Sequence, residues 1–187
     1  MNKQDFLADR FLIAMPTLAD PNFSQTVTYI CEHNPQGAMG IVINRRMEIQ
    51  LGDVLQQLDF ETCDKNIAAR EVYLGGPVLQ ERGFVVHRSI GEWETSLIVN
   101  DDIAVTTSRD ILAAISAGQG PAEFLVALGY AGWGAGQLEA EMAENAWLTS
   151  PANAEIIFNT PLERRWHEAA RSIGIDPGQI SSYSGHA

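Results

Sequence analysis

Cys31 and His33 are the side chains whose type and spacing most directly suggest chemistry, because a thiol and an imidazole can act together as metal ligands or as a nucleophile and its base. They lie two positions apart in the apolar segment 25–33, and residues i and i+2 of a strand project from the same face. A zinc site needs further ligands, for which only His87 and Cys63 are candidates. A buried cysteine beside a histidine that bonds the backbone explains the pair without a metal. We expect neither a metal nor a cofactor here.

The signatures of common catalytic sites are absent from the sequence. There is no G-x-x-x-x-G-K-[ST] and no G-x-S-x-G around any serine, so P-loop and serine-hydrolase chemistry have no support. The segment HEAAR, starting at His167, resembles half of the zinc-protease motif, but Arg171 occupies the place of the second histidine and cannot bind zinc. We expect an exposed polar patch there, on the last helix. A Cys–His nucleophilic pair would lack a third, orienting group, and we assign no catalytic residue.

A run of closely spaced glycines makes the segment LGYAGWGAGQLEAEM look like a phosphate-binding loop that opens a helix. The spacing G-x-x-G-x-G-x-G fits neither the Rossmann nor the Walker pattern, and the helix that follows begins with acids that would repel a phosphate. We expect a buried strand, a close-packed glycine turn and an acidic amphipathic helix held by Leu138 and Met142. Gln137 stays a candidate binding residue.

The segment LGGPV has two readings. Free N–H groups of Gly75 and Gly76 would form an anion-binding nest with Arg82 or His87 nearby on the next strand. A tight turn without a ligand explains the same residues, and we favour it because such turns are common.

The elements that must position these residues are mostly strands. Eight segments alternate or run apolar and β-branched, and they are expected to form strands: 10–15, 25–33, 37–44, 71–76, 82–88, 96–100, 103–107 and 123–133. The segment NPQG joins the second and third as a hairpin, because Asn34, Pro35 and Gly37 suit a type I turn. Thr26–His33 should therefore pair with Ala38–Asn44.

Helices are fewer. One apolar stripe runs from Leu51 to Leu58, and another from Ile111 to Ile115 follows a candidate Ser108 cap. The last helix combines a capping box from Thr160 to Glu163 with Pro161 at its first position, and Gly174 ends it. Runs of strands with helices between and after them predict an α+β fold, with a mainly antiparallel or mixed sheet curled into a barrel-like core.

Composition limits the class of protein. The 187 residues suit one domain, and the formal net charge of -12 with only two lysines, Lys3 and Lys65, makes direct nucleic-acid or anionic-membrane binding unfavourable. Two distant cysteines, no signal peptide and no apolar run of membrane length indicate a cytoplasmic protein. We expect a monomer or a homodimer, with residues 1–9 and 176–187 as peripheral termini of a single domain 1–187.

Long motifs of the sequence resemble the AlgH/YqgE family of small bacterial proteins. The segments FLIAMPTLADPNFSQTVTYICEHNPQGAMGIVIN, LGGPV, GFVVH and LGYAGWGAGQLEAEMAENAWL occur in the family's order and spacing, between Phe11 and Ile175. The resemblance implies a single α+β domain in which a bifurcated sheet curls into a pseudo-barrel flanked by helices. The family has no assigned catalytic residue, so none can be carried over.

Six positions are candidates for a binding site. His33, Asn44, His87 and Gln137 are polar residues on or beside apolar strands, and Gly75 and Gly76 form the turn described above. Polar groups that converge among apolar strands make a pocket.

Three hypotheses follow for function. The leading one is a cytosolic protein without catalysis that binds a small molecule or a protein partner. The second is a transcriptional regulator that acts indirectly, because some members of the family that the sequence resembles are described as transcriptional regulators. The third is a hydrolase or transferase that uses His33 or His87 as its base.

Overall fold

The computed structural model describes residues 6–15 and 23–176 of the chain. Its strands are β1 (Arg10–Ala14), β2 (Val27–Asn34), β3 (Gly37–Val42), β4 (Arg46–Gln50), β5 (Glu71–Leu74), β6 (Val78–Arg88), β7 (Ser96–Ile98), β8 (Ile103–Thr106), β9 (Phe124–Gly134) and β10 (Trp147–Pro151). Its helices are α1 (Leu51–Gln57), α2 (Lys65–Ala68), α3 (Arg109–Ser116), α4 (Gln137–Ala143), α5 (Ala154–Phe158) and α6 (Arg165–Arg171), the last preceded by the 3-10 turn Leu162–Arg164.

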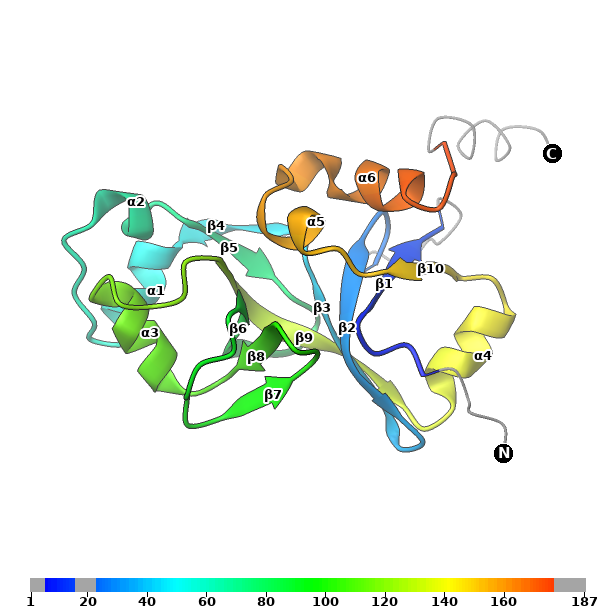
Figure 1. Cartoon of the computed structure of the whole chain (residues 1–187), viewed down its shortest axis with the longest axis horizontal. Helices are drawn as coiled ribbons and strands as arrows, with labels where there is room; N and C mark the ends of the chain where they lie inside the picture. Colours follow the sequence, from blue (N-terminus) through cyan, green and yellow to red (C-terminus); the bar gives the residue numbers. More distant parts are fainter. Residues whose placement is uncertain (1–5, 16–22, 177–187) are drawn as a thin grey trace.

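One mixed sheet connects all the strands. Its order is β10-β1-β2-β3-β9-β6-β8-β7, and β5 pairs with both β4 and β9. The long strand β9 joins the two halves of the molecule in Figure 1, because its first part pairs with β6 and its last part, 131–134, pairs with β3. Among the described strands, every pairing is antiparallel except that of β5 with β9. The sheet curls into a half-barrel with helices around it, which confirms the predicted α+β class.

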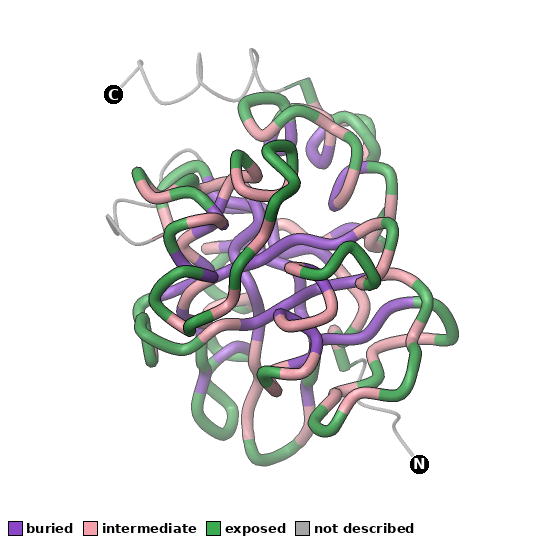
Figure 2. The backbone as a smooth tube through the Cα atoms, turned by 90° about the vertical axis from the view of Figure 1, so that its left-hand side faces the viewer, coloured by how far each residue is buried: buried purple, intermediate pink, exposed green. Residues whose placement is uncertain are grey.

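Three apolar clusters fill the structure on the two faces of the curled sheet. The largest includes Phe11, Tyr29 and Ile41 and is covered by α5 and α6. A second lies under α1 and α3, and a third contains Trp133 and Trp147 beside α4. Figure 2 shows the buried segments crossing the middle of the molecule, with exposed turns around them. Both tryptophans therefore anchor the core with their large apolar rings.

The hairpin NPQG forms as predicted. The side chain of Asn34 accepts a hydrogen bond from the backbone N–H of Gln36 at 2.9 Å, and β2 and β3 pair on either side. The alternation of β2 is broken by a β-bulge between Ile30 and Glu32. A bulge inserts one residue and reverses the faces that follow it. Cys31 accordingly packs in the largest cluster, whereas His33 turns toward α4, so the expectation that these two share a face is wrong.

The helices over 51–58 and 111–115 and the acidic helix after Gly136 are confirmed, but the last helix begins differently from the prediction. Thr160 does not cap it. Its hydroxyl and its N–H both bond to the carbonyl oxygen of Glu155, where they close α5, and a 3-10 turn follows before α6. The end of α6 is as predicted, because Gly174 adopts a φ of +77° and Ile175 N–H bonds to Ala170 at 3.1 Å.

The prediction from sequence missed four short elements: β4, β10, α2 and α5. The predicted peripheral termini lie largely outside the described residues. Across residues 6–15 and 23–176, no helix is long and apolar enough to cross a membrane.

Candidate functional site

His33 lies at the end of β2 and is only 8% exposed. Its Nδ1 accepts a hydrogen bond from the backbone N–H of Leu7 at 2.8 Å, so in the neutral ring the proton is on Nε2, which donates to Glu139 at 2.6 Å. The amide of Glu139 itself and the His33 ring hold the pKa of the Glu139 carboxyl below its ordinary value. Both ring nitrogens are thus engaged in joining the segment before β1 to helix α4.

Asn44 and Gln137 organise turns. The side chain of Asn44 accepts from Val27 N–H and donates to the carbonyl of Gln25, each at 2.9 Å, which fixes the start of β2. Gln137 is exposed at the start of α4, and its side-chain oxygen accepts from the N–H of Gly134 at 3.0 Å. These contacts satisfy backbone groups that the turns leave unpaired.

Gly75 and Gly76 are buried against the backbone of β9. The N–H of Gly75 donates to the carbonyl of Leu128 at 2.8 Å, so it is not free to bind an anion. A Cβ on Gly75 would lie 2.3 Å from the carbonyl oxygen of Gly129, and one on Gly76 would lie 2.1 Å from the backbone of Tyr130. Close approach of two backbones explains both glycines.

His87 is fully buried on β6. Its Nε2 lies 2.7 Å from the Thr106 hydroxyl, which in turn lies 2.6 Å from the Ser96 hydroxyl. Burial lowers the pKa of His87 below its ordinary value, so the ring is neutral near pH 7. A row of polar side chains therefore crosses β6, β8 and β7 and ends at Ser96.

The structure does not bring the six sequence candidates into one hollow. His33 bonds to Glu139 of helix α4, and Gln137 is the first residue of that helix. Asn44 and Gly75 lie at the end of β3, and His87 is buried within the sheet. Across the described part of the chain, no group of three or more His, Cys, Asp or Glu side chains is placed to hold a metal ion. A role for these six in binding stays a prediction.

The feature that sequence reasoning missed is a groove of about 750 Å³ at the open end of the half-barrel. It lies between the β2–β3 hairpin and the edge formed by β6, β7 and β8, at the bottom of Figure 1. The groove is lined by Glu32, Asn34, Gln36, Gly37, Ala38, Met39, Val78, Leu79, Arg82, Phe84, Thr95, Ser96, Leu97, Val105, Thr107, Tyr130, Gly132 and Trp133.

The floor of the groove is an extension of the largest apolar cluster. Met39, Leu97 and Tyr130 are partly buried and pack against that cluster, and the rings of Tyr130 and Phe84 lie 5.5 Å apart. The rim is polar and carries one charge of each sign, Glu32 and Arg82. An apolar floor with a polar rim suits an amphipathic ligand.

β6 opens the groove by leaving β9. Its pairing shifts register between Val78 and Gly83, and Leu79 in this irregular stretch has a φ of +48° and is 54% exposed. A residue other than glycine rarely adopts this conformation. The unusual run VLQERG between two apolar segments is the signal in the sequence that marks the place.

Comparisons with known proteins agree on one family. The AlgH-like family profile matches residues 11–178. A UPF0301 protein of Nitrosococcus oceani is 54% identical over 187 residues, with 100% of each chain covered. Another from Stenotrophomonas maltophilia is 52% identical over 180 residues, 96% of each chain.

Two solved structures resemble the fold. The solution structure of the AlgH protein from Pseudomonas aeruginosa is 47% identical with a TM-score of 0.82, and the match covers 100% of this chain and 99% of that one. A crystal structure of a Corynebacterium diphtheriae protein is 20% identical with a TM-score of 0.71, covering 100% and 95%, which establishes a common fold alone.

Proposed function

The chain belongs to the AlgH-like family, and on that premise we propose that it is a cytosolic binding protein without catalysis, whose groove receives an extended segment of a partner protein. The observation that carries the proposal is the edge of β9 beside the groove. On the side of β6, the pairing of described strands with β9 ends at Tyr130, while β9 continues to Gly134. Gly132 and Trp133, beyond the last pair, line the groove.

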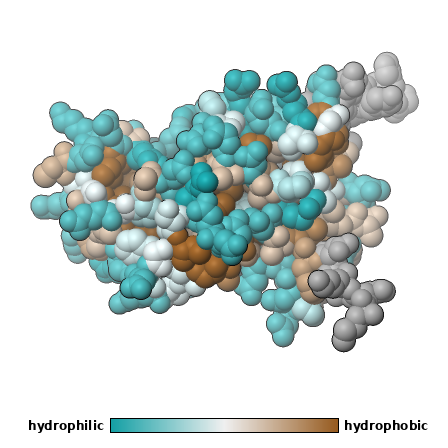
Figure 3. Space-filling model, in the orientation of Figure 1, coloured by the Kyte–Doolittle hydropathy of each residue, from teal (hydrophilic) through white to brown (hydrophobic). Residues whose placement is uncertain are grey.

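The stretch of β9 at Gly132 and Trp133, which pairs with no described strand on this side, lies next to an apolar floor and supports binding by strand addition. In this mode the backbone of an extended peptide pairs with the edge, and alternate side chains enter the apolar floor. Figure 3 shows an apolar area low in the middle of the molecule, over the region of β7, whose Leu97 lines the groove. The open form of the groove favours a peptide over a small molecule, since small ligands prefer sites that enclose most of their surface.

The alternatives fit the geometry less well. A histidine base is disfavoured because His87 is fully buried and both ring nitrogens of His33 are bonded. An indirect role in transcriptional regulation is compatible with the proposal, because the bound partner protein would contact the DNA or the transcription machinery in place of this chain.

Selection from a library of random peptides displayed on phage tests the proposal. Enriched peptides should be extended and carry an apolar residue, and Leu79→Ser should weaken their binding about tenfold, because one leucine contact is lost. Ile98→Ser is the matched control: Ile98 is 51% exposed against 54% for Leu79, but it does not line the groove. Equal weakening by both substitutions, or no enrichment, would contradict the proposal.

A further inference from the structure

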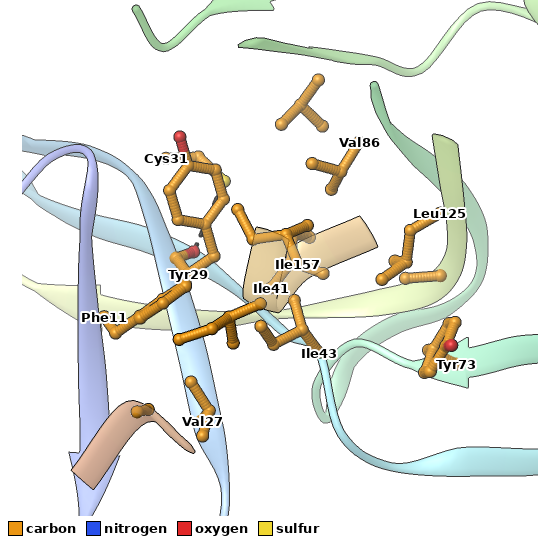
Figure 4. Close-up of a cluster of buried hydrophobic side chains, with 14 of the residues drawn as sticks. Phe11, Val27, Tyr29, Cys31, Ile41, Ile43, Tyr73, Val86, Leu125 and Ile157 are labelled. Atoms are coloured by element: carbon orange, nitrogen blue, oxygen red, sulfur yellow. Dashed lines mark hydrogen bonds between the residues drawn. The ribbon is translucent and has the colours of Figure 1, made fainter. Parts of the chain in front are cut away.

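A second hollow, of about 470 Å³, lies on another part of the molecule, between β5, the start of β9 and the segment from α5 to α6. Two cations and two carboxylates line it: Arg70, Arg165, Glu71 and Glu123. Tyr73, on β5, lies against Arg165 and contributes its ring to the largest apolar cluster, at the edge of which it appears in Figure 4. We call this hollow the arginine pocket.

Arg165 is buried, with 4% of its surface exposed, although it carries a charge. Its Nε donates to the carbonyl of Thr160 at 3.0 Å, a second nitrogen donates to the carbonyl of Ile43, and the guanidinium lies 5.1 Å from the centre of the Tyr73 ring. None of the salt bridges between described residues includes Arg165. Burying a cation without an opposite charge costs free energy, and a bound anion would offset that cost.

Arg70 lines the same hollow and is half-buried. It donates from Nη2 to the carbonyl of Phe124 at 2.6 Å and stacks 4.0 Å from the centre of that ring. Desolvation lowers the pKa of Arg70, and Arg70 too is absent from the salt bridges of the described chain. The one hydrogen bond described for it leaves other donors of its five N–H groups for a ligand.

The carboxylates of the pocket are engaged by arginines that do not line it. Glu71 accepts from Arg46 at 3.2 Å and from the Tyr73 hydroxyl at 3.1 Å. Glu123 accepts from Arg88 at 3.1 Å. The four charges that line the pocket sum to zero, and Arg88 also pairs with Asp102 at 2.7 Å. Among the described residues the two lining arginines form no salt bridge with the two lining carboxylates, so their charges stay available to a ligand.

We propose that the arginine pocket binds the oxyanion group, phosphate or carboxylate, of a small organic anion. Guanidinium groups match both oxyanions in charge and in fork geometry, and a pair of them holds such a group better than a single lysine would. Asn66, Asn159 and Thr160 line the same hollow. The side chains of Asn159 and Thr160 already donate to Glu155, so Asn66 is the residue that offers a polar contact to the rest of the ligand. This site is separate from the groove and does not depend on the partner proposed for it.

The test is a titration followed by ¹H–¹⁵N NMR, with inorganic phosphate in one arm and malonate in the other, at constant ionic strength set with sodium chloride. The proposal predicts saturable shifts at the amides of Tyr73, Phe124 and Arg165 in at least one arm. The arm that saturates at the lower concentration identifies the preferred oxyanion. Shifts that do not saturate with either anion, or that follow the chloride reference, would overturn the proposal.

Substitution locates the site. Arg70→Gln should weaken the apparent affinity about tenfold, because one charge-assisted contact is lost. Arg109→Gln is the matched control, since Arg109 makes the same two contacts outside the pocket, to the Leu58 carbonyl at 2.7 Å and over the Phe60 ring at 5.1 Å. Equal affinity in both variants would overturn the assignment. If Arg70→Gln does not fold, Arg70→Lys takes its place and should weaken binding less, because it keeps the charge but loses the forked guanidinium.

Discussion

At the scale of single residues, His87 is a side chain that can take up a proton but lies where a charge is unfavourable. It is 0% exposed, its Nε2 is bonded to Thr106, and its Nδ1 has no hydrogen-bond partner among the described residues. A neutral imidazole tolerates this environment, but a protonated ring would bury a charge without a counter-charge. Protonation of the His87 ring therefore opposes folding.

The free energy of unfolding should depend on pH through His87. Its folded pKa lies below the ordinary 6.5, so the unfolded chain takes up the proton first as pH falls. The stabilising contribution is complete above about pH 6.5 and is lost below it, by at most about 1.4 kcal/mol per pH unit. Urea denaturation from pH 8 to pH 5 would measure this.

His87→Gln is the comparison for that measurement, because glutamine keeps a polar group toward Thr106 but does not titrate. The difference in unfolding free energy between the two proteins should be constant above about pH 6.5 and should shift in favour of the variant below it. Parallel curves across the whole range would show that His87 is not the titrating group.

At the scale of elements, β5 and the turn after it are pressed against β9. The N–H of Gly75 bonds to Leu128, and its carbonyl accepts from Val42, so this one residue connects β9 with the end of β3. There is no room for a side chain at the crossing. The two halves of the molecule thus meet at a backbone-to-backbone contact that only glycine permits.

Gly75→Ala should destabilise the protein by about 3 kcal/mol, because the new methyl group would overlap backbone that cannot move away. Gly83→Ala provides the control on β6, where a Cβ would meet only Leu112, at 3.9 Å, and we expect it to cost less than about 1 kcal/mol. Thermal or urea denaturation compares the two. Similar losses in both would show that the crossing is not tightly packed.

At the scale of the whole molecule, the distribution of charge argues against contact with nucleic acid. The sequence has two pairs of adjacent arginines, Arg45–Arg46 and Arg164–Arg165. They do not form a basic track, because Arg165 is buried, Arg46 is paired with Glu71, and Arg164 is paired with Glu168. Affinity for DNA comes mainly from cations that replace counter-ions on phosphates. A chain of net charge -12 repels the duplex instead.

A gel-shift assay at about 50 mM salt should therefore show no tight binding to duplex DNA. The arginine pocket is not expected to bind the duplex either, because it is a recess that admits a small group and not a surface that follows the DNA backbone. A retarded band whose affinity fell steeply with added salt would contradict this and would favour direct regulation of transcription.

Much of the fold could be predicted from periodicity and turn chemistry. The eight predicted strands all form, because their apolar faces are buried on one or both sides of a continuous sheet. β4 was missed because it is short and largely exposed, and β10 because it is short and ends at Pro151. The bulge in β2 has no signature in the residues around Cys31, so the reversal of His33 needed the structure.

The site could be predicted far less well, for a physical reason. Polar residues such as His33 and Asn44 stand out in an apolar sequence, but each forms a hydrogen bond with the backbone of a distant segment, which explains it without a ligand. The groove and the arginine pocket are formed by segments far apart in sequence. Arg70 and Arg165 become neighbours of one hollow only when β5 and α6 pack against the same core.

β9 is also a strand that the ribosome makes late. Residues 1–123 are synthesised before any of β9, so β3, β5 and β6 all emerge without the strand that joins them. β1 pairs with β2 and β10, and β10 is synthesised even later than β9. Unpaired strand edges on a nascent chain are templates for wrong association. Completion of β9 and β10 therefore ends the interval in which this protein is most exposed to aggregation during its own synthesis.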